Sequence, residues 1–191
     1  DGAAVLTADA AMAANADHWF VRATIGMIRR TMARHAVSSR LIDLAGMTRA
    51  HIADPHIVAK LERGEADRIR VCVGASFCIN RLHQGLESVC IQNPATGREI
   101  HIPQLVTPSG SAGVKAVVVG AGPGGLESAR VLAARGHDVV LFEAQDRVGG
   151  QVVLAARASE RQSELLGITG WLEREVEHAG VDVRLGTPVD A

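Results

Sequence analysis

Three glycines, Gly120, Gly122 and Gly125, form a G-x-G-x-x-G motif between an apolar run and a segment with helical spacing. In that context the first glycine permits a tight turn, the second lets the backbone approach a pyrophosphate, and the third lets the helix pack against the strand. The diphosphate would lie at the helix N-terminus, where unpaired N–H groups and the positive end of the helix dipole favour an anion. Pro123 suits the first helical turn. The motif therefore predicts a dinucleotide site.

An acidic residue and a second glycine pair follow this motif in register. Glu143 closes the next predicted strand, 18 residues after Gly125, where its carboxylate can accept hydrogen bonds from both hydroxyls of an adenosine ribose. We therefore expect a free 2′-hydroxyl and not a 2′-phosphate. A glycine-rich turn without a ligand is the alternative, and the register of strand, glycines, helix, strand and acid disfavours it. The predicted cofactor-binding residues here are Gly120, Ala121, Gly122, Pro123, Gly124, Gly125, Glu143, Ala144, Arg147, Gly150 and Gln151.

Three cysteines, Cys72, Cys78 and Cys90, lie within one short stretch. The first residues of the chain lack the basic start and apolar run of an export signal, which disfavours a disulfide framework. A metal site and chance clustering remain as the two interpretations.

Strands and helices alternate in two parts of the chain, which predicts an α/β fold. The expected elements of the first part are strand 20–25, helix 27–38, strand 41–47, and helix 55–62 with Asp54 as its N-cap. Residues 71–113 are rich in turn signals and are interpreted as an irregular connector. The second part predicts half of a doubly wound sheet, with strand 116–119, helix 123–134, strand 138–143, helix 160–178 capped by Ser159, and strand 181–185.

The composition limits the classes of partner. The chain has 20 basic and 21 acidic residues among 191, so no global field would attract nucleic acid or an anionic membrane. No apolar run approaches the roughly 20 residues that a membrane span needs, and we expect a cytoplasmic protein. Partners should be a small-molecule substrate, a dinucleotide cofactor and, in a homo-oligomer, other subunits. The chain begins without methionine and ends just after a predicted strand, so we expect it to be part of a longer protein.

The order of a barrel end, a cysteine connector and a dinucleotide unit resembles the multidomain NADH:flavin oxidoreductases related to Old Yellow Enzyme. These include trimethylamine dehydrogenase, 2,4-dienoyl-CoA reductase and N-methylproline demethylase. The E-x5-G-G extension from Glu143 to Gly150 resembles the FAD fingerprint of flavoprotein disulfide reductases, and the motifs at 46–55 and 67–75 look most like the demethylase branch. The resemblance implies that 1–68 are the last β/α units of an FMN-binding TIM barrel, 69–113 an iron-sulfur connector, and 114–191 a truncated Rossmann-type domain for FAD or ADP.

The resemblance also implies two further sites. Met47, Thr48 and Arg49 would end the eighth barrel strand, with Arg49 holding the FMN phosphate, although the arginine that the family usually places after the seventh strand is missing at 23–26. Cys72, Cys78 and Cys90 match three of four cluster cysteines, while Ala75 occupies the second position. A three-iron cluster, a four-iron cluster completed by water or His83, and no cluster all remain open.

The family's chemistry implies a flavin-dependent oxidoreductase that oxidises or N-demethylates a small methylated amine. NAD(P)H-dependent enoyl reduction is the alternative reaction, and a module that binds ADP only as a structural ligand is the alternative class. The chain alone should be inactive, because the resemblance assigns most barrel strands and the substrate face to a region outside it.

Overall fold

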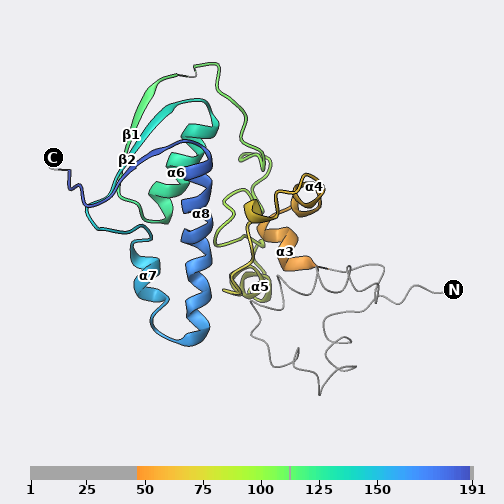
Figure 1. Cartoon of the computed structure of the whole chain (residues 1–191). Coiled ribbons are helices and arrows are strands. Elements are labelled where there is room, and N and C mark those ends of the chain that lie inside the picture. Colours follow the sequence, from red (N-terminus) through yellow and green to blue (C-terminus); the bar gives the residue numbers. More distant parts are fainter. Residues whose placement is uncertain (1–46, 112, 190–191) are drawn as a thin grey trace.

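The computed structural model describes residues 47–111 and 113–189 (Figure 1). The strand and helix expected at 20–25 and 27–38, and nearly all of the strand expected at 41–47, lie outside the described residues. The predicted barrel end is therefore not tested by the structure.

The second part of the chain forms the predicted parallel sheet. Its strands are β1 (Lys115–Val119), β2 (Asp138–Phe142) and β3 (Asp182–Arg184), in the order β1-β2-β3. Both pairs are parallel, with Val117 opposite Val140 and Leu141 opposite Val183. Parallel neighbours need a crossover, and helices α6 (Pro123–Ala134) and α8 (Leu166–His178) lie in the two crossovers. The predicted α/β unit is thus confirmed, with a last strand shorter than expected.

Helices α6 and α8 lie side by side on one face of the sheet and bury the core against it (Figure 1). Successive strand residues point to opposite faces, so Val139 and Leu141 of β2 are buried beneath the helices. Val117 and Val119 lie on the opposite face of β1 and are 64% and 62% exposed. The remaining core residues come largely from the helices and include Leu126, Ala129, Ile168, Trp171, Leu172 and Val176.

The predicted helix at 160–178 has two parts. A 3-10 helix, η3 (Glu160–Leu165), precedes α8, and the Ser159 hydroxyl accepts the Gln162 N–H at 3.3 Å. This is the N-cap contact that the sequence predicted. A short helix that the sequence did not indicate, α7 (Gln151–Ala155), leads into this segment.

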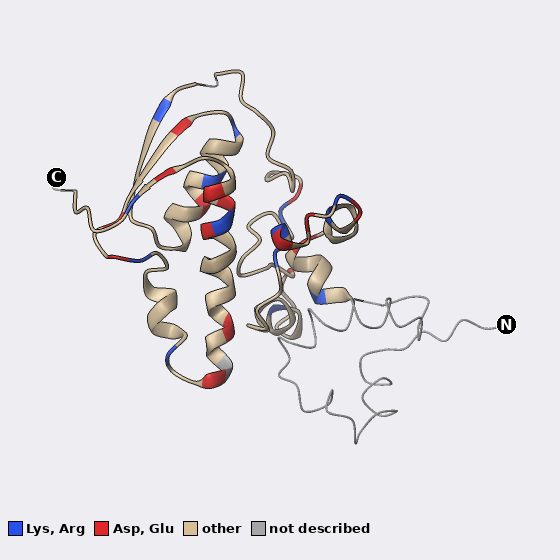
Figure 2. Ribbon diagram, viewed as in Figure 1, with Lys and Arg blue, Asp and Glu red and all other residues tan. Residues whose placement is uncertain are grey.

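The chain before and within the connector contains more helix than its sequence indicated. Two short helices were not predicted, α3 (Thr48–Ala53) before the connector and α5 (Phe77–His83) within it. They pack beside the sheet unit with α4 (Ile57–Glu62), which corresponds to the helix predicted at 55–62, and a 3-10 turn, η2 (Ala66–Arg68). Helix α4 begins two residues later than predicted, with His56 at the N-cap position. Asp54 still accepts the His56 N–H at 3.1 Å, although its carboxylate also binds Lys60. Acidic and basic positions are interspersed on the helices and connector (Figure 2).

Candidate dinucleotide-binding site

The glycine loop begins where β1 ends, at the carboxyl edge of the parallel sheet. Gly120 has a φ of +94°, a conformation that disfavours residues with a Cβ, and its N–H donates to the Phe142 carbonyl at 2.7 Å. The chain can therefore turn sharply while the loop stays tied to β2. This is the role that the motif assigned to its first glycine.

The third glycine allows helix α6 to lie directly against the loop. A Cβ built on Gly125 would stand 1.8 Å from the Gly120 carbonyl oxygen, a distance that no side chain could tolerate. By contrast, a Cβ on Gly122 would meet nothing within 4 Å, so open space lies beside the second glycine. Helix α6 has Pro123 in its first turn and no acidic residue there, which leaves the positive end of its dipole uncompensated. A diphosphate fits this arrangement.

The second glycine pair packs against the first loop, although it lies about 30 residues later. The Gly149 N–H donates to the Ala121 carbonyl at 2.8 Å, and a Cβ on Gly150 would be 3.2 Å from the Gly122 Cα. Both glycines have positive φ, at +114° and +51°. The two glycine motifs are therefore in direct contact. Gln151, the first residue of α7, follows the second motif.

Glu143 follows β2 and reaches back to the glycine loop. One carboxylate oxygen accepts the Gln145 N–H at 2.9 Å, and the other accepts the Ala121 N–H at 2.7 Å. These backbone donors, Gln145 first and then Ala121, hold the pKa of Glu143 below its ordinary value. Each ionised oxygen retains a further acceptor position. The carboxylate can therefore accept hydroxyl donors while it braces the loop.

Ala121 was predicted to bind the cofactor, but the sequence did not reveal that it also holds the loop together. It is completely buried, its N–H binds Glu143, and its carbonyl binds Gly149. All three motifs thus meet at one residue. Ala144 and Arg147 lie on the exposed segment between Glu143 and the second glycine pair, where Arg147 is 3.8 Å from Asp146.

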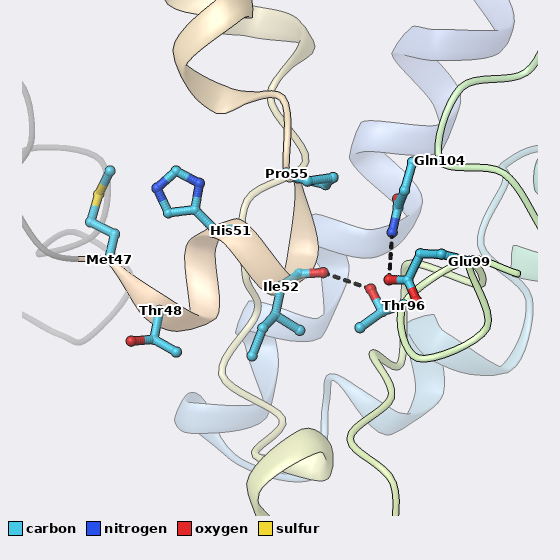
Figure 3. A pocket seen from close by; sticks show the side chains of 8 residues that line it. All are labelled: Met47, Thr48, His51, Ile52, Pro55, Thr96, Glu99 and Gln104. Carbon is cyan, nitrogen blue, oxygen red and sulfur yellow. Dashed lines mark hydrogen bonds between the residues drawn. The ribbon is translucent and has the colours of Figure 1, made fainter.

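The residues expected to hold an FMN phosphate lie at the start of α3, away from the glycine loop. Met47 and Thr48 line an open pocket of about 460 Å³ (Figure 3), and the other lining residues are His51, Ile52, Pro55, Thr96, Glu99 and Gln104. Backbone N–H groups, first its own, hold the pKa of Glu99 below the ordinary value. Glu99 is exposed to solvent, so screening weakens its charge, which does not decide for or against a phosphate nearby. The assignment of Arg49 stays a prediction.

The three cysteines occupy different surroundings within the connector. Cys78 is buried in α5, whereas Cys72 and Cys90 are half-buried, and none of them forms a disulfide bond. Burial raises the pKa of Cys90, and the N–H groups of Gln92 and Asn93 oppose that shift. Within 47–111 and 113–189, no three His, Cys, Asp or Glu side chains are grouped to hold a metal ion. Three thiols also fall short of the four that a four-iron cluster usually takes.

Comparison with known proteins agrees with the motif. Residues 118–163 match the model of an NAD(P)-binding Rossmann-like domain. The N,N-dimethylglycine/sarcosine dehydrogenase of Chromohalobacter salexigens is 55% identical over 150 residues, which are 78% of this chain and 22% of that protein. The multifunctional alkene reductase/demethylase OYE of Caballeronia cordobensis is 47% identical over 152 residues, 80% of this chain and 22% of that protein.

Over most of its length the chain is therefore similar to members of the Old Yellow Enzyme-like family of multidomain flavin oxidoreductases. A solved member of similar structure is histamine dehydrogenase from Rhizobium sp. 4-9, with a TM-score of 0.73 and 32% identity over 83% of this chain and 23% of its own. The resemblance inferred from the motifs is therefore confirmed. This Old Yellow Enzyme-like chain spans less than a quarter of the length of each of these relatives. Among its described helices, none is long and apolar enough to cross a membrane.

Proposed function

We propose that residues 114–189 bind the ADP half of FAD and that the longer protein is a flavin-dependent oxidoreductase acting on a small methylated amine. The observation that carries the first part is the convergence of both glycine motifs and Glu143 at the main chain of Ala121. This site offers backbone N–H donors to the diphosphate and the Glu143 carboxylate to the ribose.

Each group of this chain has a defined task in that proposal. The N-terminus of α6 holds the diphosphate, and Gly122 gives it room to approach the backbone. Glu143 accepts the ribose hydroxyls and excludes a 2′-phosphate, because two like charges would share one site. Arg147 supplies a nearby cation. When bound, the flavin supplies the redox chemistry, and the protein binds and orients it.

The amine substrate is inferred from the relatives. One is named for the oxidation of dimethylglycine and sarcosine, and another for both alkene reduction and demethylation. We propose that 1–68 complete an FMN barrel, that Met47, Thr48 and Arg49 belong to its phosphate end, and that 69–113 form the relay connector with Cys72, Cys78 and Cys90. NAD(P)H is the electron donor only if the longer protein works as a reductase.

Calorimetric titration of the chain tests the nucleotide site. We expect ADP to bind, FAD to bind more tightly, and 2′-phosphorylated ADP to bind at least about tenfold more weakly than ADP, a difference of about 1.4 kcal/mol. Equal affinity for the 2′-phosphorylated nucleotide would contradict the role of Glu143. Binding of ADP without any gain for FAD would indicate a structural ADP module.

Anaerobic reduction of the flavin in the longer protein tests the reaction. N,N-dimethylglycine should bleach the flavin absorbance in the absence of any nicotinamide. If only NADH bleaches it and an enoyl compound restores it, the protein is a reductase and the amine proposal fails.

A further inference from the structure

One segment, Arg68–Val73, runs from the end of η2 into the connector and lies along helix α8. The Arg68 guanidinium binds both carboxylate oxygens of Glu175 at 3.0 and 2.8 Å, and the Arg68 carbonyl accepts the Trp171 indole N–H at 2.9 Å. At the other end, Val73 lies 3.1 Å from the Cβ position of Gly167. The contacts thus pass from residue 175 through 171 to 167, four residues at a time. This segment, which we call the clasp, runs antiparallel to one face of α8.

Arg70 is the central residue of the clasp and is buried. Its exposed fraction is 7%, and its guanidinium lies 4.0 Å from the centroid of the Trp171 ring, which is itself 4% exposed. It also lies 3.8 Å from the carboxylate of Glu127, which α6 holds through two hydrogen bonds from Arg130 at 2.9 and 2.7 Å. The guanidinium therefore touches both helices that cover the sheet.

The main chain of Arg70 is fixed from the connector side as well. Its N–H donates to the buried Asp54 carboxylate at 2.9 Å, and Lys60 binds the same carboxylate at 2.6 Å. A buried charge is costly unless it has partners, and a linker that only spans two domains has no need of one. Arg70 joins the turn before α4, helix α6 and helix α8 at one point.

The clasp also reaches the core beneath the glycine loop. Val73 is 7% exposed and belongs to the same apolar cluster as Ala121 and Leu126. Cys72 lies between Arg70 and Val73 in sequence, so both of its flanks are anchored to the dinucleotide unit.

We propose that Arg70 is a positioning residue that holds the cysteine connector in fixed register on the dinucleotide unit. The two parts then behave as one rigid body, and the separation between Cys72 and the glycine loop is set by the clasp. The functional meaning of that fixed separation rests on the proposed function, but the rigidity itself does not.

Thiol labelling of the whole chain tests this proposal. Variant Arg70→Met keeps an unbranched apolar side chain that ends at the level of the arginine Nε, and it removes the charge and the planar stacking. We expect the labelling rates of Cys72 and Cys90 by a maleimide, resolved by mass spectrometry, to rise by about tenfold, because local opening becomes easier. Hydrogen exchange of β1 and the affinity for ADP should stay within about twofold of the wild type. Arg70→Lys should give partial rescue, since it restores the charge without the flat stacking surface.

Arg63→Gln is the matched control, because Arg63 lies shortly before the clasp and its exposed side chain pairs at 2.7 Å with Glu65, two residues later, in the described structure. Its labelling rates should equal the wild-type rates. Arg68→Gln, which breaks the half-exposed pair with Glu175, provides a milder variant if Arg70→Met does not fold, and it should raise the Cys72 rate alone.

Two results would overturn the proposal. Unchanged labelling of Cys72 in Arg70→Met, or in Arg68→Gln if only that variant folds, would show that the clasp does not hold the connector. Equal acceleration of Cys72 labelling and β1 exchange would show that Arg70 contributes only to global stability. Labelling is measured without nucleotide. A failure to bind ADP would therefore contradict the proposed function without affecting the result of this test.

Discussion

Replacement of Glu143 by alanine should weaken the binding of ADP and FAD. The carboxylate oxygens of Glu143 each accept one backbone N–H and offer a further acceptor position to a ribose hydroxyl. A hydrogen bond to a charged group contributes about 1.5 to 3 kcal/mol net. Loss of the ribose acceptor should therefore reduce affinity by about 10- to 150-fold.

The same substitution removes a structural contact, and the two effects must be separated. Ala121 is completely buried, and its N–H donates to Glu143 at 2.7 Å. The Glu143→Ala variant leaves this buried donor without its partner. An unsatisfied buried donor costs about 1 to 3 kcal/mol, so the unliganded variant should also be less stable by that amount. Denaturant unfolding of the unliganded chain measures this loss, and calorimetry well below the unfolding transition measures affinity. Asp146→Ala is the control, because that carboxylate is 89% exposed and its ion pair with Arg147 is long, at 3.8 Å.

A nucleotide without the 2′-hydroxyl isolates the ribose contact. Wild-type protein should bind 2′-deoxy-ADP more weakly than ADP, whereas the Glu143→Ala variant should bind the two nucleotides nearly equally. The pKa of Glu143 is lowered in the folded protein, so the preference for ADP should persist as pH falls through the ordinary carboxyl range. Equal ADP affinity in wild type and variant, or an undiminished penalty for 2′-deoxy-ADP in the variant, would refute the assignment of Glu143.

Four further substitutions test other parts of the structure. Gly125→Ala should destabilise the chain by at least about 1 to 3 kcal/mol and abolish ADP binding, because its Cβ overlaps the loop carbonyl at 1.8 Å; calorimetry and urea unfolding check both effects. Asp54→Asn should lower stability at neutral pH by about 3 to 5 kcal/mol, because it leaves Lys60 without its buried partner. Although burial raises the pKa of Asp54, hydrogen bonds from Lys60 and Arg70 lower it overall, so the wild-type advantage should vanish as pH falls through that lowered pKa in acid unfolding. Ala75→Cys should increase the iron and sulfide bound by the anaerobically purified longer protein and Cys78→Ala should abolish them; iron retained in the latter would exclude these cysteines as ligands.

The dinucleotide unit was predictable because its determinants are local in sequence. Gly120 and Gly125 are required by one turn and one helix contact, and both contacts lie within the motif itself. The short helix α5 of the connector was not predictable, for the opposite reason. Helix α5 begins after Ser76, which has a φ of +57° and makes no side-chain cap, and helices of this length depend on tertiary packing.

The way in which the site is held together was only partly visible in the sequence. Glu143 was predicted as a ribose ligand, but its contact with Ala121 depends on a backbone N–H that any residue would supply. Nothing in the sequence predicts that the indole N–H and the ring of Trp171 contact Arg68 and Arg70, about 100 residues earlier. Side-chain patterns identify groups that need a particular residue type, and they are silent about main-chain partners and long-range pairs.

The clasp changes how the connector should be understood. The residue pattern separates residues 69–113 from the sheet unit, because turn residues and cysteines replace the alternation of strands and helices there. Core membership is decided by three-dimensional contact instead, and Val73 shares one apolar cluster with Ala121 of the glycine loop. The glycine loop and Val73, the residue after Cys72, therefore pack in one core. This part of the connector belongs to the folded unit and is not a separate linker.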